Sequence, residues 1–503
     1  FSKFFAGFFL GSSIVLAFQP FNYWFLTFLI PGLLYQLIKR ESIKNVFFIS
    51  YFFGFGLWAF GIFWIENSLT VYGGASPILG GFLTLLLASF LSLFQAFSFS
   101  VFKVVSSKRK TYEVYLLFPA TWVLSEWLRE FLFTGFPWLY IGYTAVDNTL
   151  IQGYIPVLGV FGIGFFIVFI SQIILSLLGN LKDLSRGKSL FLPALILVIV
   201  FIGNQPLEKV NWTKSTENIT AIVVQPNIDI KEKWTQRGLK KIESEIEKKL
   251  TQNPIQNLTE PTFIFWPEVT QTSFVKRNEI DEFRNNILKE NNMLGMVMGV
   301  LSETKSEKIN NSLIGFGNIS GIYDKKFLVP FGEYVPFSGF FSIFFDFFNF
   351  NRPQILPGEK NDLIGNDLIK ISSVICYEIA YQAAFLSNSR NTNLLLNASN
   401  DNWFGTGLGP HQHLQIARFR AAEHQKYLVR STSTGISALI DHQGQIIRKI
   451  DTMVRESKSK TIEESIVLRS GQTPYANFGK FPFLFSLVII FFMSAILKFR
   501  KDE

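Results

Sequence analysis

The stretch IKISSVICYE, Ile369–Glu378, has the pattern of a buried β-strand that runs directly into Cys376. Cys376 is the only cysteine among 503 residues, so no disulfide can form within the chain. α/β folds gather reactive groups at the ends of their strands, so a thiol at this point is a candidate nucleophile. The ordinary alternative is a small core residue, which is the commoner role of a lone cysteine.

Two other polar residues also follow predicted strands. Glu268 comes after Phe263–Trp266 and a proline, and Lys325 comes after a short run that begins at Gly321. A carboxylate can take the proton of a thiol, and a lysine can stabilise a developing oxyanion. Each residue also has an ordinary reading, a cap or turn for the glutamate and a solvated loop position for the lysine. Together the three supply what acyl transfer needs without a histidine.

The region around these residues, 204–479, alternates strands with helices. Apolar, β-rich runs predict strands at Ile219–Val224, Phe263–Trp266, Met293–Val300, Leu313–Phe316, Ile369–Ile375 and Leu394–Leu396. Helical spacing of apolar residues predicts helices over Leu239–Leu250, Ile280–Ile287 and Gln412–Gln425. The segment Leu428–Ile447 is typical of a hairpin with Gly444 in its turn. Strands separated by helices indicate a layered α/β domain.

The rest of the chain is strongly apolar. Hydrophobic residues make up 49% of the sequence and charged residues 17%, against about 25% charged residues in soluble domains. Apolar runs of roughly 20 residues can span a bilayer. We therefore expect an α-helical membrane bundle of eight spans, seven within residues 1–203 and one within 480–503. The runs are Phe4–Phe18, Trp24–Ile38, Val46–Ile65, Ile78–Val101, Tyr112–Leu128, Val157–Leu178, Leu190–Ile202 and Phe481–Phe499.

Basic residues alternate from loop to loop between these runs. They gather in Lys39–Lys44, Lys103–Lys110, Lys182–Lys188 and Lys498–Lys501, while the intervening loops hold almost none. This pattern predicts that both termini are cytoplasmic and that 204–479 lies outside. The basic loops also explain the net charge of +9 as a signal of membrane topology. We therefore expect membrane lipids and no nucleic acid as partners. Because the chain opens at Phe1 and not at Met, we expect that some residues precede it.

Two further features suit a lipid substrate. Phe340–Phe350 holds seven phenylalanines but is too short to span a bilayer, so it could dip into the outer leaflet or simply pack beneath a loop. Four ionisable residues, Glu66, Glu126, Arg129 and Glu130, lie within or at the outer ends of predicted spans. Such groups face protein or water and not lipid. They could contact headgroups or pair with one another, and the sequence does not choose.

Several longer motifs resemble those of a known family. FWPE (Phe265–Glu268), YDKKFLVPFGEYVP (Tyr323–Pro336) and CYE (Cys376–Glu378) resemble the Glu-Lys-Cys sites of the nitrilase superfamily. With the eight-span frame, the chain resembles the membrane-embedded apolipoprotein N-acyltransferase family over nearly its whole length. The other matching motifs are GFPW (Gly135–Trp138), QPNI (Gln225–Ile228), Lys233-Trp234, SNDNWFG (Ser399–Gly405), Gly409-Pro410 and QHL (Gln412–Leu414).

The resemblance implies an αββα sandwich fold for 204–479 and a place in the bacterial cytoplasmic membrane. It also implies the reaction. An acyl chain passes from a phospholipid, typically phosphatidylethanolamine, to the enzyme cysteine. The thioester then acylates the free α-amine of a diacylglyceryl-cysteine apolipoprotein. We expect no cofactor, and the sequence shows neither a phosphate-binding loop of the P-loop type nor Cys/His metal spacing.

The resemblance also implies residue roles. Glu268 is the base, Lys325 the oxyanion partner and Cys376 the nucleophile. The supporting residues are Glu333, Glu378 and Tyr377, whose backbone N–H could complete the oxyanion hole, and the expected walls of the substrate cleft are Trp234 and Tyr334. The alternative for the two acids is a solvated loop position, which the surrounding motifs disfavour, whereas the aromatics could equally be ordinary packing residues.

Three other functions would fit parts of the sequence. A membrane-tethered nitrilase-type amidase would have the same three residues but use water as acceptor, and it would not need eight spans. An inactive lipoprotein-binding scaffold would be indicated by loss of Glu268, Lys325 or Cys376, and all three are present. A transporter would leave the large α/β region without a role.

Overall fold

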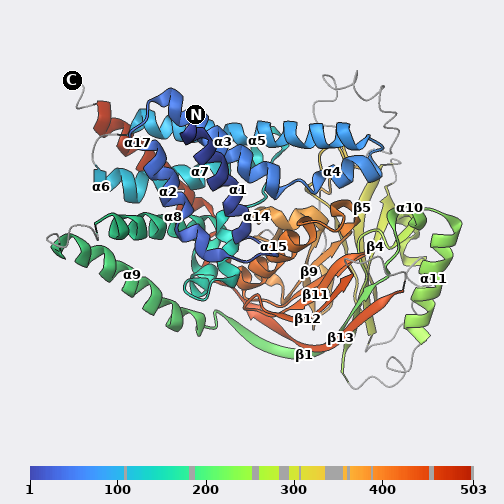
Figure 1. Ribbon diagram of the computed structural model, residues 1–503. Helices are drawn as coiled ribbons and strands as arrows, with labels where there is room; N and C mark the ends of the chain where they lie inside the picture. Colours follow the sequence, from blue (N-terminus) through green and yellow to red (C-terminus); the bar gives the residue numbers. More distant parts are fainter. Residues whose placement is uncertain are drawn as a thin grey trace. The chain divides into compact units, whose positions relative to one another are not determined.

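The computed structural model describes residues 1–106, 110–180, 187–251, 260–282, 294–304, 308–334, 355–359, 363–386, 389–452 and 458–499. Its contacts divide the chain into two compact units (Figure 1). We call the first the helical unit, which comprises Phe1–Asn211, Gly407–Gln415 and Pro474–Glu503. We call the second the two-sheet unit, which comprises Trp212–Thr406 and Ile416–Thr473.

The helical unit is built from apolar helices with polar caps. Ser42 and Ser76 cap α3 and α5 by accepting hydrogen bonds from the backbone N–H groups of Asn45 and Leu79, both at 3.3 Å. The helices are α1 (Ser2–Ile14), α2 (Ile30–Ile38), α3 (Ile43–Gly61), α4 (Ile65–Asn67), α5 (Pro77–Val105), α6 (Lys110–Tyr112), α7 (Phe118–Phe131), α8 (Ile155–Asn180), α9 (Gly187–Glu208), α16 (Pro474–Phe478) and α17 (Phe481–Phe499).

Close packing of α1 on α3 depends on a small residue. A Cβ atom added at Gly11 would lie 1.8 Å from the carbonyl oxygen of Phe53, so no larger residue fits there. Small residues at such crossings let two backbones approach, as in helices that associate within a bilayer.

Five helical segments are long and apolar enough to cross a membrane among the described residues: Ile43–Gly61, Pro77–Val105, Gln152–Gly179, Phe191–Glu208 and Phe481–Lys498. They correspond to five of the eight predicted spans. Two further predicted spans coincide with the shorter apolar helices Ser2–Ala17 and Trp24–Ile38. The remaining one, Tyr112–Leu128, falls on α7 and the π-helical turn before it, which also carry four buried charged residues, Glu113, Glu126, Arg129 and Glu130. The bundle of eight spans therefore stays a prediction.

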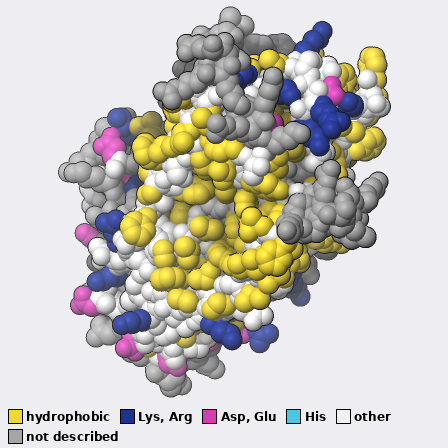
Figure 2. All heavy atoms as spheres, turned by 90° about the vertical axis from the view of Figure 1, so that its left-hand side faces the viewer, with side chains coloured by type: hydrophobic (Ala, Val, Ile, Leu, Met, Phe, Trp, Pro, Cys, Tyr) yellow, Lys and Arg dark blue, Asp and Glu magenta, His cyan; other side chains and the backbone are white. Residues whose placement is uncertain are grey.

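The helical unit exposes a broad apolar surface (Figure 2). On α17, Phe481, Phe485 and Phe492 are each about two-thirds exposed. On α9, Phe191 and Ile202 are exposed to a similar degree. A continuous apolar surface of this kind is unfavourable in water and is expected where lipid covers the protein.

The two-sheet unit contains a seven-stranded and a six-stranded sheet, as the predicted layered α/β domain requires. The first has the order β13-β1-β2-β4-β5-β6 with β3 beside β4, and the second has the order β12-β11-β10-β9-β8-β7. The first sheet comprises β1 (Thr213–Gln225), β2 (Thr262–Phe265), β3 (Gln271–Lys276), β4 (Leu294–Glu303), β5 (Ile309–Gly317), β6 (Ile322–Asp324) and β13 (Lys460–Gly471). The second comprises β7 (Ile364–Gly365), β8 (Lys370–Ile375), β9 (Leu394–Ser399), β10 (Leu428–Thr432), β11 (Gly435–Ile440) and β12 (Ile446–Thr452).

Each sheet has a parallel centre and antiparallel edges. β1, β2 and β4 pair in parallel, as do β8, β9 and β10. Helices α10 (Ile230–Lys233) and α11 (Gln236–Thr251) lie between β1 and β2, and α15 (Gly409–His424) lies between β9 and β10. Every residue of β2 and of β9 is buried, which is typical of parallel strands covered on both faces.

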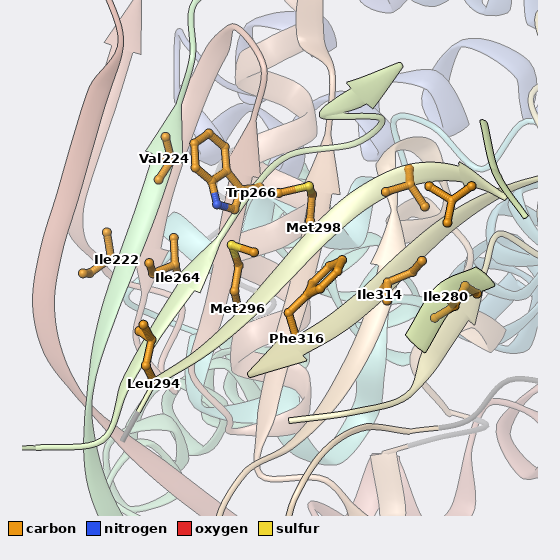
Figure 3. Packing of buried hydrophobic residues seen from close by; sticks show 12 residues of the cluster. Ile222, Val224, Ile264, Trp266, Ile280, Leu294, Met296, Met298, Ile314 and Phe316 are labelled. Atoms are coloured by element: carbon orange, nitrogen blue, oxygen red, sulfur yellow. The ribbon is translucent and has the colours of Figure 1, made fainter. Parts of the chain in front are cut away.

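The core of the first sheet follows the two-residue period of its strands (Figure 3). Ile222 and Val224 of β1, Ile264 of β2, and Met296 and Met298 of β4 lie on the same face. Ile246 of α11 packs against this cluster, so α11 covers the face. The opposite face meets the second sheet, where the Ser431 hydroxyl donates to the carbonyls of Val224 and Phe265, both at 3.2 Å.

Most predicted strands are confirmed, with two differences. The segment predicted as one hairpin holds two turns, because β10, β11 and β12 form a three-stranded antiparallel meander. Gly444 lies in the second turn with φ 81°, the left-handed conformation that favours glycine. The short predicted strand before Lys325 is β6, whereas the long edge strand β13 and the short strands β3 and β7 were not predicted. The expected arm Phe340–Phe350 and most of the helix predicted at Ile280–Ile287 lie outside the described residues.

Candidate active site

Cys376 stands where β8 ends and a short 3-10 turn, Cys376–Ala380, begins. Its φ is 52°, a left-handed conformation that is uncommon for a residue with a side chain. Strained backbone of this kind persists only where the surroundings hold it, and it concentrates at functional sites. The side chain is buried, with 5% of the residue exposed.

Glu268 and Lys325 come from the other sheet and meet each other. Glu268 follows β2, and Lys325 follows β6 directly. The Lys325 Nζ lies 3.4 Å from the Glu268 Oε1, and both residues are buried. A Cβ atom at Gly299 of β4 would lie 2.8 Å from the Glu268 Cα, so the turn that carries Glu268 crosses β4 where only glycine leaves room. The two predicted partners are therefore held together by the sheet.

Glu333 joins this pair. One of its carboxylate oxygens lies 2.9 Å from the Lys325 Nζ, and its Oε2 accepts a hydrogen bond from the backbone N–H of Val329 at 2.8 Å. Asn311 of β5 donates to the Oε1 of Glu268 at 2.7 Å and to the Oε1 of Glu333 at 3.3 Å. Lys325 thus lies between two carboxylates, and Asn311 fixes the orientation of both.

Glu378 ties the loop after Lys325 to the strand that ends at Cys376. Its carboxylate accepts hydrogen bonds from the backbone N–H groups of Lys326 at 2.6 Å, Phe327 at 2.9 Å and Ile375 at 2.7 Å. The Tyr323 hydroxyl donates to it at 3.1 Å. A fully buried carboxylate with four donors is a structural link between the lysine and cysteine segments, which are far apart in sequence.

The pKa values of the site residues follow from their burial and from the charges of their neighbours. Burial raises the pKa of the Cys376 thiol to about 12 and the charge of Glu268 adds to this, while Lys325 and a hydrogen bond with Ser399 act in the opposite direction. Burial alone would lower the pKa of Lys325, but Glu333, Glu268 and Cys376 raise it above its ordinary value. Burial raises the pKa of Glu378 to about 7 against the effect of its hydrogen-bond donors and Lys325. The thiol is therefore protonated at rest beside a lysine that stays cationic.

Comparison with known proteins shows the family of the chain. The family model of the apolipoprotein N-acyltransferase N-terminal domain matches residues 10–173, and that of carbon-nitrogen hydrolase matches residues 222–465. The apolipoprotein N-acyltransferase of Haemophilus influenzae is 34% identical, over 95% of this chain and 91% of its own length. The chain belongs to the apolipoprotein N-acyltransferase family. The relative from Photobacterium profundum is 31% identical, over 98% of this chain and 94% of its own length.

A solved structure of Saccharomyces cerevisiae Nit3, a member of branch 10 of the nitrilase superfamily, is 18% identical to this chain. It aligns with a TM-score of 0.37 over 50% of this chain and 91% of its own. The membership in an acyltransferase family rests on the sequence relatives, and the layered α/β fold on the carbon-nitrogen hydrolase match.

Three other residues predicted for the candidate site, Tyr377, Trp234 and Tyr334, have no described contact that tests their expected roles. Tyr377 is buried, with its ring 5.5 Å from that of Tyr381. Trp234 directly follows α10 and is 53% exposed. Tyr334 is half-buried, and its carbonyl accepts a hydrogen bond from the N–H of Phe331 at 2.8 Å. Their roles in the oxyanion hole and the cleft stay predictions.

Sequence reasoning missed two buried polar residues at this site. Asn311, which orients both glutamates, lay just before the predicted strand Leu313–Phe316, and the polar pair Asn310-Asn311 was the available signal. Lys233 is buried with its Nζ 3.1 Å from the backbone carbonyl of Glu268. Burial lowers the pKa of Lys233 to about 8, against the effect of the Glu268 charge. The signal that could have identified Lys233 is its place in the Lys233-Trp234 motif, which matches the family.

Two of the four ionisable residues predicted within or at the ends of spans, Arg129 and Glu130, contact protein groups in the helical unit. Arg129 donates to the carbonyls of Phe136 at 2.7 Å and Trp138 at 2.6 Å, and its guanidinium lies 4.4 Å from the centre of the Trp58 ring. Glu130 pairs with Lys480 at 2.7 Å.

The same unit brings two family motifs together. The Gln412 Oε1 accepts hydrogen bonds from the indole N–H groups of Trp64 at 3.2 Å and Trp138 at 2.7 Å. The GFPW and QHL motifs, which are far apart in the chain, thus meet inside the helical unit and have a structural role there.

Proposed function

We propose that this chain transfers an acyl chain from a membrane phospholipid, through a thioester on Cys376, to the N-terminal α-amine of diacylglyceryl-cysteine apolipoproteins. The observation that carries the proposal is the arrangement around Lys325, a buried ammonium held between Glu268 and Glu333 and electrostatically coupled to the thiol of Cys376. Family membership supplies the type of reaction. Phosphatidylethanolamine is the proposed donor.

The first half-reaction begins with a protonated thiol. Glu268 takes the proton as the sulfur attacks the ester carbonyl of the phospholipid, because a thiol whose pKa is raised to about 12 is not ionised in advance. Lys325 and the backbone N–H of Tyr377 stabilise the oxyanion that forms. The C–O bond to the glycerol then breaks, and the leaving alkoxide takes the proton from Glu268. The products are a lysophospholipid and the thioester.

The second half-reaction uses the same groups in the same order. The free α-amine of the apolipoprotein attacks the thioester carbonyl, and Glu268 takes a proton from the nitrogen. The same oxyanion partners act, the C–S bond breaks, and the cysteine sulfur recovers the proton. Across the two steps one ester bond is exchanged for one amide bond, with no net change in protons and no cofactor. Glu333 and Glu378 act as supporting residues that keep Lys325 and Cys376 in place.

The membrane arrangement is also part of the proposal. Residues 1–203 would supply seven spans and 480–503 the eighth, with both termini cytoplasmic and 204–479 on the periplasmic side of the bacterial cytoplasmic membrane. The alternating basic loops and the exposed apolar surface of the helical unit support it. In a Cys376→Ala background, a membrane-impermeant thiol reagent should label Lys248→Cys and not Arg109→Cys in intact cells. The reverse pattern would overturn the orientation.

Mass spectrometry of the purified protein tests the reaction. Incubation with phosphatidylethanolamine vesicles should add one acyl mass to the peptide that contains Cys376, and a diacylglyceryl lipopeptide with a free amine should then remove it. Release of the acyl group as free fatty acid, at the same rate with and without the lipopeptide, would favour the amidase-like alternative that uses water. Absence of an adduct on Cys376 while transfer proceeds would overturn the thioester.

The role of Glu268 can be tested by following the two half-reactions separately. Glu268→Gln keeps the shape of the side chain but cannot accept a proton, so both formation of the adduct and its transfer should be slow. If adduct formation proceeds at the normal rate and only transfer fails, Glu268 does not activate the thiol.

A further inference from the structure

A buried hydrogen-bond network lies behind Cys376 and is centred on Arg430 of β10. The Arg430 side chain is fully buried. Its Nη2 donates to both carboxylate oxygens of Asp401, at 2.9 and 2.8 Å, and its Nη1 donates to the Oδ1 of Asn397. Its Nε donates to the carbonyl of Ile436 at 3.1 Å. A buried guanidinium is tolerated only when its charge is paired and its donors are used, and here they are.

Two branches of this network reach Cys376. In the first, the Asn397 Nδ2 donates to the backbone carbonyl of Cys376 at 3.2 Å. In the second, the Ser399 hydroxyl donates to the Oδ1 of Asp401 at 3.3 Å, and Ser399 is also hydrogen bonded to the thiol of Cys376. One guanidinium is therefore connected both to the backbone and to the sulfur of the same residue.

The register of the second sheet explains why these residues meet. Arg430 on β10 is paired with Asn397 on β9, and Asn397 is paired with Val374 on β8. Side chains of residues two apart in a strand point to the same face. Ser399 therefore shares the face of Asn397 and lies one step closer to the end of the sheet, where Cys376 follows β8.

We infer that Arg430, Asn397, Asp401 and Ser399 form a positioning network that holds Cys376 in its left-handed conformation and provides a hydrogen bond to its thiolate. The inference rests on the proposed role of Cys376 as nucleophile. While the thiol is protonated, the Ser399 hydroxyl donates to Asp401. When Glu268 removes the proton, the same hydroxyl can turn and donate to the sulfur anion. Hydrogen bonds to charged groups are stronger than those between neutral groups, so this donation favours the thiolate.

Charges around the sulfur show why Arg430 is needed. Glu268 and Asp401 both raise the pKa of the thiol, while Lys325 and the Ser399 hydrogen bond lower it. Asp401 placed alone beside Cys376 would oppose formation of the thiolate. Its bidentate pairing with Arg430 offsets that charge and leaves Asp401 free to orient Ser399.

Thiol alkylation tests the network without any lipid. Cys376 is the only cysteine of the chain, so the mass added by iodoacetamide to the full-length protein in detergent reports on it alone. Ser399→Ala should lower the alkylation rate at pH 8 by roughly tenfold, as expected for loss of one hydrogen bond to an anion, and should shift the pH–rate profile upward. Ser399→Thr keeps the hydroxyl and should restore the rate.

Ser373→Ala is the matched control. Ser373 lies on β8, is buried like Ser399, and its hydroxyl has no hydrogen-bond partner among the described residues. This variant should alkylate at the wild-type rate. A wild-type rate for Ser399→Ala, or equal slowing by both alanine variants, would overturn the inference.

The Arg430 branch has its own readout. Arg430→Lys retains one charge but cannot bind Asp401 and Asn397 together, so it should alkylate slowly even in the fraction that elutes as folded protein. If that variant does not fold, Asn397→Ala, which removes the donor to the Cys376 carbonyl and the acceptor of Arg430 without adding a charge, takes its place with the same expected slowing. Wild-type reactivity in the variant that folds would overturn this part. Loss of the lipid-dependent adduct with these rates unchanged would count against the proposed function and not against the network.

Discussion

The helical unit and the two-sheet unit each bury cations beside acidic groups, but they hold them differently. In the helical unit, Arg129 is bound by backbone carbonyls and an aromatic face, and Lys480 pairs with Glu130 and lies near the rings of Phe161 and Phe481. In the two-sheet unit, Lys325 lies between two carboxylates and is coupled to a thiol. The first arrangement compensates the positive charge of each cation. The second gathers two carboxylates around one cation, an arrangement that suits the proton transfers we propose.

The largest effect is expected from replacing the proposed nucleophile, because this removes the reactive group of the two-sheet unit. Cys376→Ala should abolish both the acyl adduct and transfer while the protein stays folded, as checked by adduct mass and size-exclusion chromatography. Cys376→Ser should be nearly inactive as well, because a hydroxyl has a much higher pKa and needs a stronger base. Full turnover by Cys376→Ala would show that the chemistry lies elsewhere.

Removing one paired lysine from each unit gives the next largest effect and a direct contrast. Lys325→Met should slow adduct formation on the order of 10²-fold or more, because it removes a cation that stabilises the oxyanion. Lys480→Met removes a cation that pairs with one carboxylate, Glu130, and should leave the rate of adduct formation per folded molecule unchanged. Single-turnover kinetics on both variants would distinguish them. Equal losses would mean that the two lysines do not differ in role.

The raised pKa of Glu378 in the two-sheet unit should also make the stability of the protein depend on pH. The pKa of Glu378 is raised from 4.5 to about 7 by burial, so the folded protein binds a proton there that the unfolded chain has released. Stability should fall as pH rises from about 4.5 to about 7, by about 3 kcal/mol at most. Unfolding followed across this range should show the slope in the wild type, and Glu378→Gln should flatten it. A slope that survives in Glu378→Gln would assign it to another group.

The two units also differ in how far sequence could predict them. Glu268, Lys325 and Cys376 each directly follow a β-rich run or its closing proline, so local pattern and family motifs were enough to single them out. Asn311 and Arg430 lie within strands, next to other polar residues, and their importance depends on Glu268, Asp401 and Asn397, which only the sheet register brings near. No local pattern contains that information.

Span prediction met a related limit in the helical unit. The region around α7 has the length of a span, but the charges of Glu126, Arg129 and Glu130 lower its hydropathy. Their partners, such as Trp122 and Ile141 for Glu126, come partly from other segments of the unit. Hydropathy counts a buried charge as a cost whether or not it has a partner, so it cannot decide whether such a helix spans. The edge strand β13 was missed because its charged residues interrupt the apolar alternation.

The smallest effect should come from a conservative change in the helical unit, and it sharpens the contrast most. Arg129→Lys keeps the positive charge but cannot donate to the carbonyls of Phe136 and Trp138 while lying flat on Trp58. Loss of the stacking and of one hydrogen bond should cost about 1–2 kcal/mol of stability, seen as a lower thermal unfolding midpoint.

The iodoacetamide reaction of Cys376 at a temperature where the variant is folded should be unchanged, because Arg129 only holds the helical unit's own backbone. Lys480→Met serves as a second change to the same unit and should behave alike in that assay. If Arg129→Lys instead slows alkylation as Ser399→Ala is expected to, the helical unit would influence the thiol directly. Its buried cations would then have to be counted with the chemistry and not only with the fold.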